Sequence, residues 1–162
     1  MIIIGIDPGI ARLGWAIVHK DIHHISASSY GCITTQETDG QPERLLCIHT
    51  KLRKLVSAHH PDAIAVEELF FATNVKTAIS VSQARGIILL VAAQEKVPVI
   101  SYTPLAVKLA ICGDGHADKS QVTRMVMRLL HLKEMPKPDD TADALAIALT
   151  HAYSYKIKAM LS

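Results

Sequence analysis

Apolar runs separated by short polar connections fill the first 35 residues of this chain. They predict three strands, over residues 2–7, about 13–19 and about 25–35, each bounded by turn-forming or charged residues. The first two are joined by Pro8-Gly9-Ile10-Ala11 and the next two by the polar segment that begins at His19-Lys20-Asp21. Connections this short favour antiparallel neighbours.

Beyond residue 40 the apolar residues recur at helical spacing. Leu45, Ile48, Leu52, Leu55 and Val56 predict a helix over about 42–58. A strand over 62–68 follows, and it ends in carboxylates. The later pattern predicts a helix over about 75–95, a short strand over 97–101, two helices between Pro104 and about residue 130, and an alanine-rich helix from Asp139 onward.

The order of these elements predicts the fold class. Three meandering strands followed by strand, helix, strand and further helices indicate an α/β protein with a mixed five-stranded sheet and helices on both faces. A chain of 162 residues suits one domain and can bury roughly two-thirds of its unfolded surface. The sequence contains no internal repeat, low-complexity tract or linker, so residues 1–162 are expected to form a single domain.

Composition narrows the class of protein. No stretch approaches the ~20 apolar residues of a membrane span, and the N-terminal run lacks the features of a signal peptide, so a soluble cytoplasmic protein is expected. Cys32, Cys47 and Cys112 form no Cys-x-x-Cys pair and are expected to be reduced thiols. Residues 101–133 are locally basic, which suits a polyanionic ligand or simply a solvated helix face.

The first predicted strand ends in Asp7, directly before the Pro8-Gly9 turn. A carboxylate at the end of a buried strand needs a counter-cation, a hydrogen-bond cage or a bound metal, because Asp and Glu are seldom buried unpaired. The simpler alternative is that Asp7 only caps the turn. Further carboxylates at the ends of later elements favour a site over a cap.

Asp140 and Asp143 stand three residues apart near the start of the last helix, so both side chains leave it from one face. Interaction with the helix dipole is the ordinary explanation for acidic residues in a first turn. Asp143, however, lies a turn deeper beside alanines and Ile147, where capping gives little. With Asp7 and Glu67 these residues form a four-carboxylate set, whose hard oxygen ligands suit Mg²⁺ or Mn²⁺.

Several short blocks together resemble a known family. They are Ile-Asp-Pro-Gly at the first turn, Gly14-Trp15-Ala16, Val66-Glu67, Gln83-Ala84-Arg85-Gly86, Lys119-Ser120-Gln121-Val122 and Asp143-Ala144-Leu145-Ala146-Ile147-Ala148. In this order they resemble the RuvC family of bacterial Holliday-junction resolvases, and the resemblance covers nearly the whole chain. No single block decides the assignment; their common register makes it specific.

The resemblance implies a ribonuclease-H-like fold, a homodimer, and cleavage of four-way DNA junctions in recombination and repair. Divalent metal would be held by the catalytic residues Asp7, Glu67, Asp140 and Asp143. Two Mg²⁺ ions, for which Mn²⁺ can substitute, would clamp the scissile phosphate, one activating water and the other stabilising the leaving 3'-oxygen. The products would be symmetrical nicks with 5'-phosphate and 3'-hydroxyl ends, and a branch-migration helicase is the expected partner.

Glu67 and Glu68 are adjacent, and either of them precedes a Phe by three residues. The distance to Asn74 and to the block around Arg85 matches the family if Glu67 is the ligand. Strand alternation agrees that only one member of the pair can share a face with the other acids.

Lys108 and Lys119 match lysines that the family uses near the active site and the DNA backbone, where they would bind phosphates without reading bases. A solvated surface lysine is the ordinary alternative. Phe70, by register with the family, would stack on a base unpaired at the junction crossover. The alternative is that Phe70 and Phe71 both pack under the following helix.

The nine histidines of the chain do not suggest a metal site. His23-His24 and His59-His60 are adjacent pairs, and no His-x-x-x-His falls on a predicted helix. The histidines are therefore expected at the surface.

Three other functions fit parts of the pattern. Actin-type and sugar-kinase ATPases share the opening strand order, but they need two such domains around the nucleotide. A non-catalytic junction-binding module could lack one of the acids, yet all four are present. A related nuclease of the ribonuclease-H fold could act on RNA or on an RNA–DNA hybrid instead.

Overall fold

The computed structural model describes the backbone of residues 1–68 and 75–161 and the side chains of residues 1–68 and 78–155. In these residues one mixed sheet has the strand order β3-β2-β1-β4-β5. β1 (Ile2–Asp7), β2 (Arg12–Lys20) and β3 (Ile25–Thr34) are antiparallel neighbours. β4 (Ala63–Glu67) pairs in parallel with β1, and β5 (Val99–Tyr102) pairs in parallel with β4.

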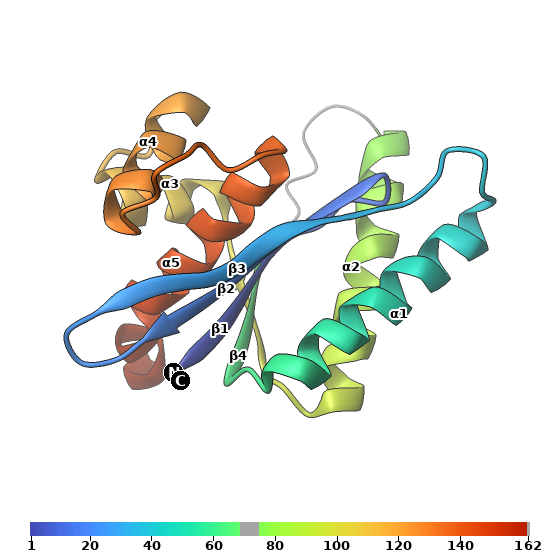
Figure 1. Cartoon of the computed structure of the whole chain (residues 1–162), viewed down its shortest axis with the longest axis horizontal. Coiled ribbons are helices and arrows are strands. Elements are labelled where there is room, and N and C mark those ends of the chain that lie inside the picture. Colours follow the sequence, from blue (N-terminus) through green and yellow to red (C-terminus); the bar gives the residue numbers. More distant parts are fainter. Residues whose placement is uncertain (69–74, 162) are drawn as a thin grey trace.

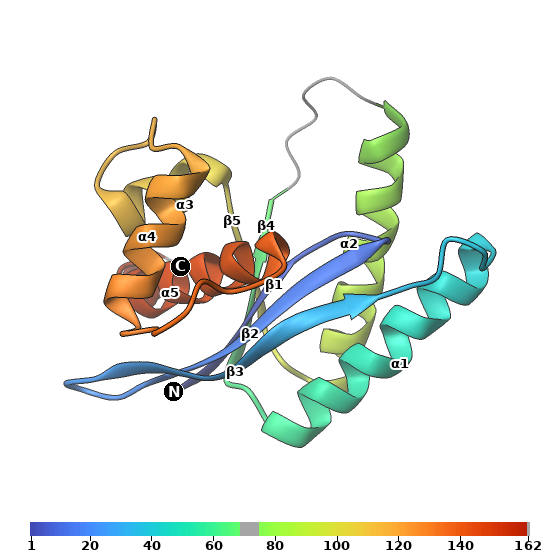
Figure 2. The same cartoon turned by 45° about the horizontal axis from the view of Figure 1, so that its top comes forward.

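Helices cover both faces of this sheet (Figures 1 and 2). α1 (Gln41–His59) and α2 (Val75–Glu95) lie on one face, and α3 (Pro104–Cys112), α4 (Lys119–Leu129) and α5 (Asp139–Leu161) lie on the other. The predicted fold class is confirmed, and the last strand begins slightly later than predicted. None of the helices in the described residues has the length and apolarity to cross a membrane.

The central strand β1 contributes to two core layers because successive side chains of a strand point to opposite faces of the sheet. Ile3 packs with residues of α3, α4 and α5. Ile4 and Ile6 pack with residues of α1 and α2. This alternation also fixes the face on which the charged residue at the end of the strand lies.

α5 lies unusually close to the sheet at Gly5. A Cβ atom on Gly5 would be 2.1 Å from the carbonyl oxygen of Ala144 and 2.7 Å from Cβ of Ala148. Real Cβ atoms do not approach backbone this closely, so only glycine fits here. Because the helix presents alanines to the strand, its axis sits low over β1, and its first turn meets the carboxyl end of that strand.

We expect Gly5→Ala to lower the free energy of unfolding by about 1–3 kcal/mol, because the added methyl must push α5 off the sheet. Lys54→Ala on α1 is the control, since Lys54 is exposed and alanine favours a helix. Urea denaturation of both variants measures the difference. Equal midpoints would mean that α5 is not seated on Gly5.

Candidate active site

Two of the acidic residues stand at the same edge and on the same face of the sheet. Asp7 ends β1 and Glu67 ends β4, and these parallel strands pair with Ile6 opposite Val66. By alternation Asp7 shares a face with Ile3 and Gly5, which is the face that α5 covers. Glu67 stands two residues after Ala65, and the side chain of Ala65 packs in the same core layer as Ile3. By the same alternation both carboxylates therefore lie on the α5 side.

Glycine brings the start of α5 to these carboxylates. Gly14 of β2 is the residue paired with Asp7, and a Cβ at Gly14 would lie 2.0 Å from the carbonyl oxygen of Asp140. The first turn of α5 therefore rests on β2 directly beside Asp7. Asp143 lies one helical turn further along the same face, as the three-residue spacing predicts.

The electrostatics of Asp7 show that the acids lie close together. Burial is the largest cause that raises the pKa of Asp7, and the negative charges of Glu67, Asp143 and Asp140 raise it further, to about 8. Burial followed by the charge of Asp143 also raises the pKa of Glu67. Such mutual repulsion costs folding free energy unless a cation is nearby.

Two basic side chains neutralise part of this charge. Nζ of Lys119 is 2.9 Å from Oδ2 of Asp143 and 3.7 Å from Oδ2 of Asp139. Nε of Arg12 is 3.1 Å from Oδ2 of Asp140. Burial acts to lower the pKa of Lys119, but the hydrogen bond and charge of Asp143 outweigh it, so the pKa is raised.

Lys119 is placed by the start of α4. Asp118 caps this helix: its side chain accepts a hydrogen bond from the backbone N–H of Gln121, and the Gln121 side chain accepts one from the backbone N–H of Asp118. This reciprocal capping box fixes the first helical turn. Lys119 is its first residue, and its side chain reaches the acids on α5.

A cavity of about 220 Å³ opens beside the acids. Glu67, Asp143, Lys108 and Lys119 supply its charged lining, and apolar residues of α3, α4 and α5 supply the rest. Both predicted lysines thus line one cavity with two of the predicted acids. An anion that enters this cavity meets two ammonium groups.

One of the four acids has a buried carboxylate oxygen that could serve a divalent cation. Oδ2 of Asp140 is buried and makes no hydrogen bond, although it lies within ion-pair distance of Arg12. The contact between Arg12 and Asp140 is therefore a charge interaction without hydrogen-bond geometry. A buried carboxylate oxygen that accepts no hydrogen bond is available as a metal ligand. Within the described residues no three His, Cys, Asp or Glu side chains already form a metal cage. The oxygen-only chemistry of the four acids nevertheless fits Mg²⁺ or Mn²⁺.

Comparison with known proteins decides the family. A family model described as crossover junction endodeoxyribonuclease RuvC matches residues 3–151. The chain belongs to the RuvC family. Its members are metal-dependent nucleases.

Curated RuvC relatives match over nearly their full length. The crossover junction endodeoxyribonuclease RuvC of Alkaliphilus oremlandii is 49% identical over 154 residues, which is 95% of this chain and 94% of the relative. That of Desulfitobacterium hafniense is 50% identical over 157 residues, covering 97% of this chain and 95% of the relative.

A solved RuvC structure matches the fold closely. Thermus thermophilus RuvC in complex with Holliday junction substrate superposes with a TM-score of 0.92 at 40% identity, covering 98% of this chain and 96% of that chain. The yeast mitochondrial Holliday junction resolvase Ydc2 shares the fold with a TM-score of 0.70 at 16% identity, covering 97% of this chain and 80% of that chain. The predicted ribonuclease-H-like fold is confirmed by the match to RuvC.

The structure brings most of the residues predicted from the RuvC resemblance to one place. Asp7, Glu67, Asp140 and Asp143 gather at the end of β1, and Lys108 and Lys119 line the adjoining cavity. Glu68, the alternative to Glu67, follows the end of β4 and is exposed. Phe70, with its neighbour Phe71, lies outside the described residues.

Sequence reasoning missed two arginines of this RuvC site. Arg12 pairs with Asp140. Arg85 donates one hydrogen bond of 2.9 Å to the carbonyl oxygen of Glu67 and another of 2.8 Å to Oγ of Ser101, so it holds the end of β4 against β5. Arg85 belongs to the block Gln83-Ala84-Arg85-Gly86, which helped to carry the family resemblance. Its place in that block was the signal in the sequence that could have identified it.

The expectation that every histidine is at the surface is wrong for His151. Its side chain is buried on α5, and its Nδ1 lies 2.8 Å from the hydroxyl of Tyr102 on β5. His151 follows Ala144, Ile147 and Ala148 at helical spacing, so it continues the face of α5 that packs on the sheet. That periodicity was visible in the sequence.

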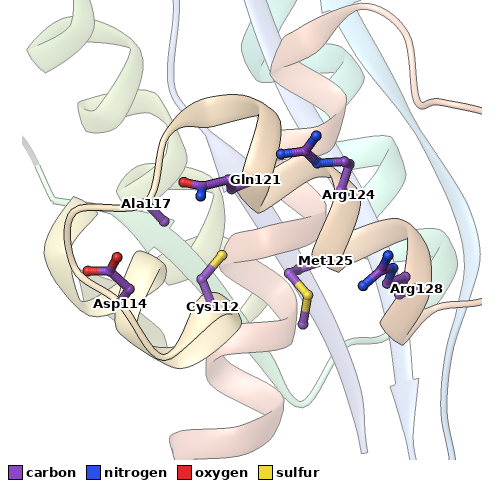
Figure 3. A pocket seen from close by; sticks show the side chains of 7 residues that line it. All are labelled: Cys112, Asp114, Ala117, Gln121, Arg124, Met125 and Arg128. Atoms are coloured by element: carbon purple, nitrogen blue, oxygen red, sulfur yellow. The ribbon is translucent and has the colours of Figure 1, made fainter.

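A larger cavity of about 500 Å³ lies elsewhere on α4 (Figure 3). Gln121, Arg124, Met125 and Arg128 line it from α4, and Cys112 lines it from α3. It shares no lining residue with the cavity that holds Lys108 and Lys119. Arg128 is not among the described residues that line the cavity holding Glu67 and Asp143, so it serves below as a control.

Proposed function

We propose that this chain resolves four-way DNA junctions by paired, symmetrical nicks, with Asp7, Glu67, Asp140 and Asp143 as its catalytic metal ligands. The observation that carries the proposal is the convergence of these four acids, from two parallel strands and one helix, at one edge of the sheet. Membership of the RuvC family supplies the reaction class, and the Thermus thermophilus relative is described in complex with Holliday junction substrate.

The ligand chemistry supports two Mg²⁺ ions per site, with Mn²⁺ as a substitute. Bound ions would supply Lewis-acid stabilisation of the scissile phosphate and an activated water for in-line attack. The four carboxylates hold this charge in place from rigid elements rather than from loops. The expected products carry 5'-phosphate and 3'-hydroxyl ends.

Lys108 and Lys119 have a different task. As cations in the cavity beside Glu67 and Asp143, they are suited to bind backbone phosphates and so fix the register of the strand. Lys119 now neutralises Asp143, and a DNA phosphate offers it an alternative anionic partner.

The decisive experiment compares three labelled substrates in Mg²⁺: a four-way junction, a linear duplex of the same sequence and an RNA–DNA hybrid. Paired nicks in the junction alone support the proposal. Cleavage of the hybrid instead favours the ribonuclease alternative, and tight junction binding without cleavage favours the non-catalytic module. Repeating the assay in Mn²⁺ tests the choice of metal.

We also propose a homodimer, because α2 exposes large apolar side chains. Ile79 and Leu90 are 55% and 48% exposed and lie three helical turns apart on one side of α2. A two-fold contact along α2 would cover them and direct two active sites at two strands of one junction. Sedimentation should report twice the chain mass of 17.6 kDa.

The double substitution Ile79→Lys with Leu90→Lys should convert this dimer to a monomer. Ile22→Lys is the control, since Ile22 is 90% exposed in the turn between β2 and β3 and its removal costs no packing. A wild-type protein that sediments as a monomer at micromolar concentration, yet still makes paired nicks, would contradict the proposal.

The remaining parts of the proposal extend from the family resemblance. We propose that residues 1–162 act as one nuclease domain, in the cytoplasm, on junctions delivered by a branch-migration helicase. Support for one domain comes from the two core layers, which both pack on the same sheet. Co-purification of the intact protein with a junction-bound helicase would test the partner.

A further inference from the structure

A second basic cavity adjoins the acid cluster on its other side. It measures about 440 Å³ and is lined by Gly9, Arg12, Gln41, Arg44, Ser80 and Asp140, among others. These residues come from the β1–β2 turn, the start of β2, the first turn of α1, α2 and the start of α5. Asp140 is thus shared between the acid cluster and this cavity.

Arg44 is held in a fixed orientation in this cavity. Its Nε donates a hydrogen bond of 2.8 Å to Oγ1 of Thr35, and that hydroxyl donates one of 2.7 Å to the carbonyl oxygen of Ile10. Thr35 is buried, with 6% of its surface exposed. The backbone N–H of Thr35 also donates to the carbonyl oxygen of Ala11. These hydrogen bonds therefore fix one edge of the Arg44 guanidinium at the wall of the cavity.

The charge of Arg44 is not compensated within the described part of the chain. The ion pairs found there join Arg12 to Asp140, Arg53 to Glu95, and Lys119 to Asp139 and Asp143. Arg44 is half-buried and takes part in none of them. A half-buried guanidinium oriented by a buried hydroxyl is costly to keep without an anion, and the fork of a guanidinium matches a phosphate bidentately.

The order of the strands shows where such a phosphate would lie. Asp7 on β1 is central, Glu67 and the two lysines lie toward β4 and β5, and Arg12 with Asp140 lies toward β2. A single strand of DNA laid across Asp7 would reach the lysine cavity on one flank and the arginine cavity on the other.

From this arrangement we infer that Arg44, together with Arg12, forms a second phosphate subsite, which binds a backbone phosphate of the cleaved strand on the β2 side of the acid cluster. The inference rests on the proposed function, because its ligand is the junction strand. It makes Arg44 a residue that binds the substrate and Thr35 the residue that positions it.

The test neutralises one phosphate at a time. Fluorescent four-way junctions carrying a single methylphosphonate at each position around the scissile bond are titrated with full-length protein in Ca²⁺, which is expected to allow binding without cleavage. For wild-type protein one position beside the scissile phosphate should weaken binding about tenfold, the size expected for one charged hydrogen-bonded contact. Arg44→Gln should weaken binding of the unmodified junction by the same factor and abolish the effect of that methylphosphonate.

Two further readouts separate binding from a structural role. The slope of log K against log salt should fall by about 0.9 for Arg44→Gln, as for the loss of one phosphate contact. Arg44→Lys keeps the charge but lacks the guanidinium fork held by Thr35. It should keep the salt slope and still lose most of the tenfold effect of that methylphosphonate. A destabilised but otherwise normal protein would show neither pattern.

Matched controls guard against a general effect of lost charge. Lys54→Gln removes a charge from an exposed site about ten residues further along α1. Arg128→Gln removes a guanidinium from the cavity in Figure 3. In both variants the methylphosphonate at the identified position should weaken binding as much as it does in wild-type protein. Suppose that wild-type protein binds and cleaves the junction, but every methylphosphonate weakens binding of Arg44→Gln as much as it weakens binding of wild-type protein. The subsite is then refuted while the proposed function stands. If wild-type protein neither binds nor cleaves the junction, the proposed function fails first.

Discussion

Asp7→Asn should reduce the rate of junction cleavage by more than about 100-fold and leave junction binding intact or stronger. Loss of a residue that only supports a metal ligand typically costs about 10–100-fold, so loss of a ligand itself should cost more. Binding should persist because the change removes a negative charge next to the DNA phosphates. Single-turnover cleavage and a binding titration on the same preparation measure the two effects. Glu67→Gln, Asp140→Asn and Asp143→Asn should behave alike.

Glu68→Gln is the matched control for this series. Glu68 is the next residue after Glu67 and is exposed, so the same chemical change there should alter cleavage only slightly. An inactive Glu68→Gln protein beside an active Glu67→Gln protein would show that the assignment is wrong by one residue. Activity in both variants would remove β4 from the site altogether.

Each half of the acid cluster was predictable because local rules place its two residues. Strand alternation places Asp7 and Glu67 on one face of two parallel neighbours, and helix periodicity places Asp140 and Asp143 on one face of α5. What joins the two pairs is the close approach of α5 to Gly14, a tertiary contact that no periodicity encodes. The family resemblance supplied that link in advance of the structure.

The basic partners could not be derived in the same way. Arg12 and Arg44 both line the cavity beside Asp140, yet they come from the start of β2 and the first turn of α1, which are far apart in the sequence. An arginine side chain is long and mobile, so its partner depends on which loops the fold brings together. His151 is the opposite case, since its burial follows from the same helical spacing that predicted the apolar face of α5.

The raised pKa of Asp7 has a consequence for folding in the absence of metal. In unfolded protein this carboxyl has its ordinary pKa of 3.8, and in folded protein the pKa is about 8. Between these values the folded state keeps a proton that the unfolded state has lost. The free energy of unfolding therefore falls as pH rises through this window, by up to about 1.4 kcal/mol per pH unit for one proton.

We expect the melting temperature of protein in EDTA to fall by roughly 5 to 10 °C between pH 5.5 and 7.5, given about 2–4 °C per kcal/mol for a chain of this size. The raised pKa of Glu67 acts in the same direction. Asp21, Asp118 and Glu95 have lowered pKa values, so their stabilisation is already complete at pH 5.5 and does not affect the slope. Millimolar Mg²⁺ should remove most of the slope, because the ionised carboxylates are then neutralised.

Asp7→Asn isolates the contribution of this one carboxyl to the pH dependence of stability. The amide cannot ionise, so the variant should melt higher than wild-type protein in EDTA at pH 7.5, and the gap should close as the pH falls to 5.5. In Mg²⁺ the advantage should shrink or reverse, since the variant lacks a ligand. Parallel melting curves for the two proteins across this range in EDTA would mean that Asp7 is ionised without metal, and that Lys119 and Arg12 already neutralise the cluster.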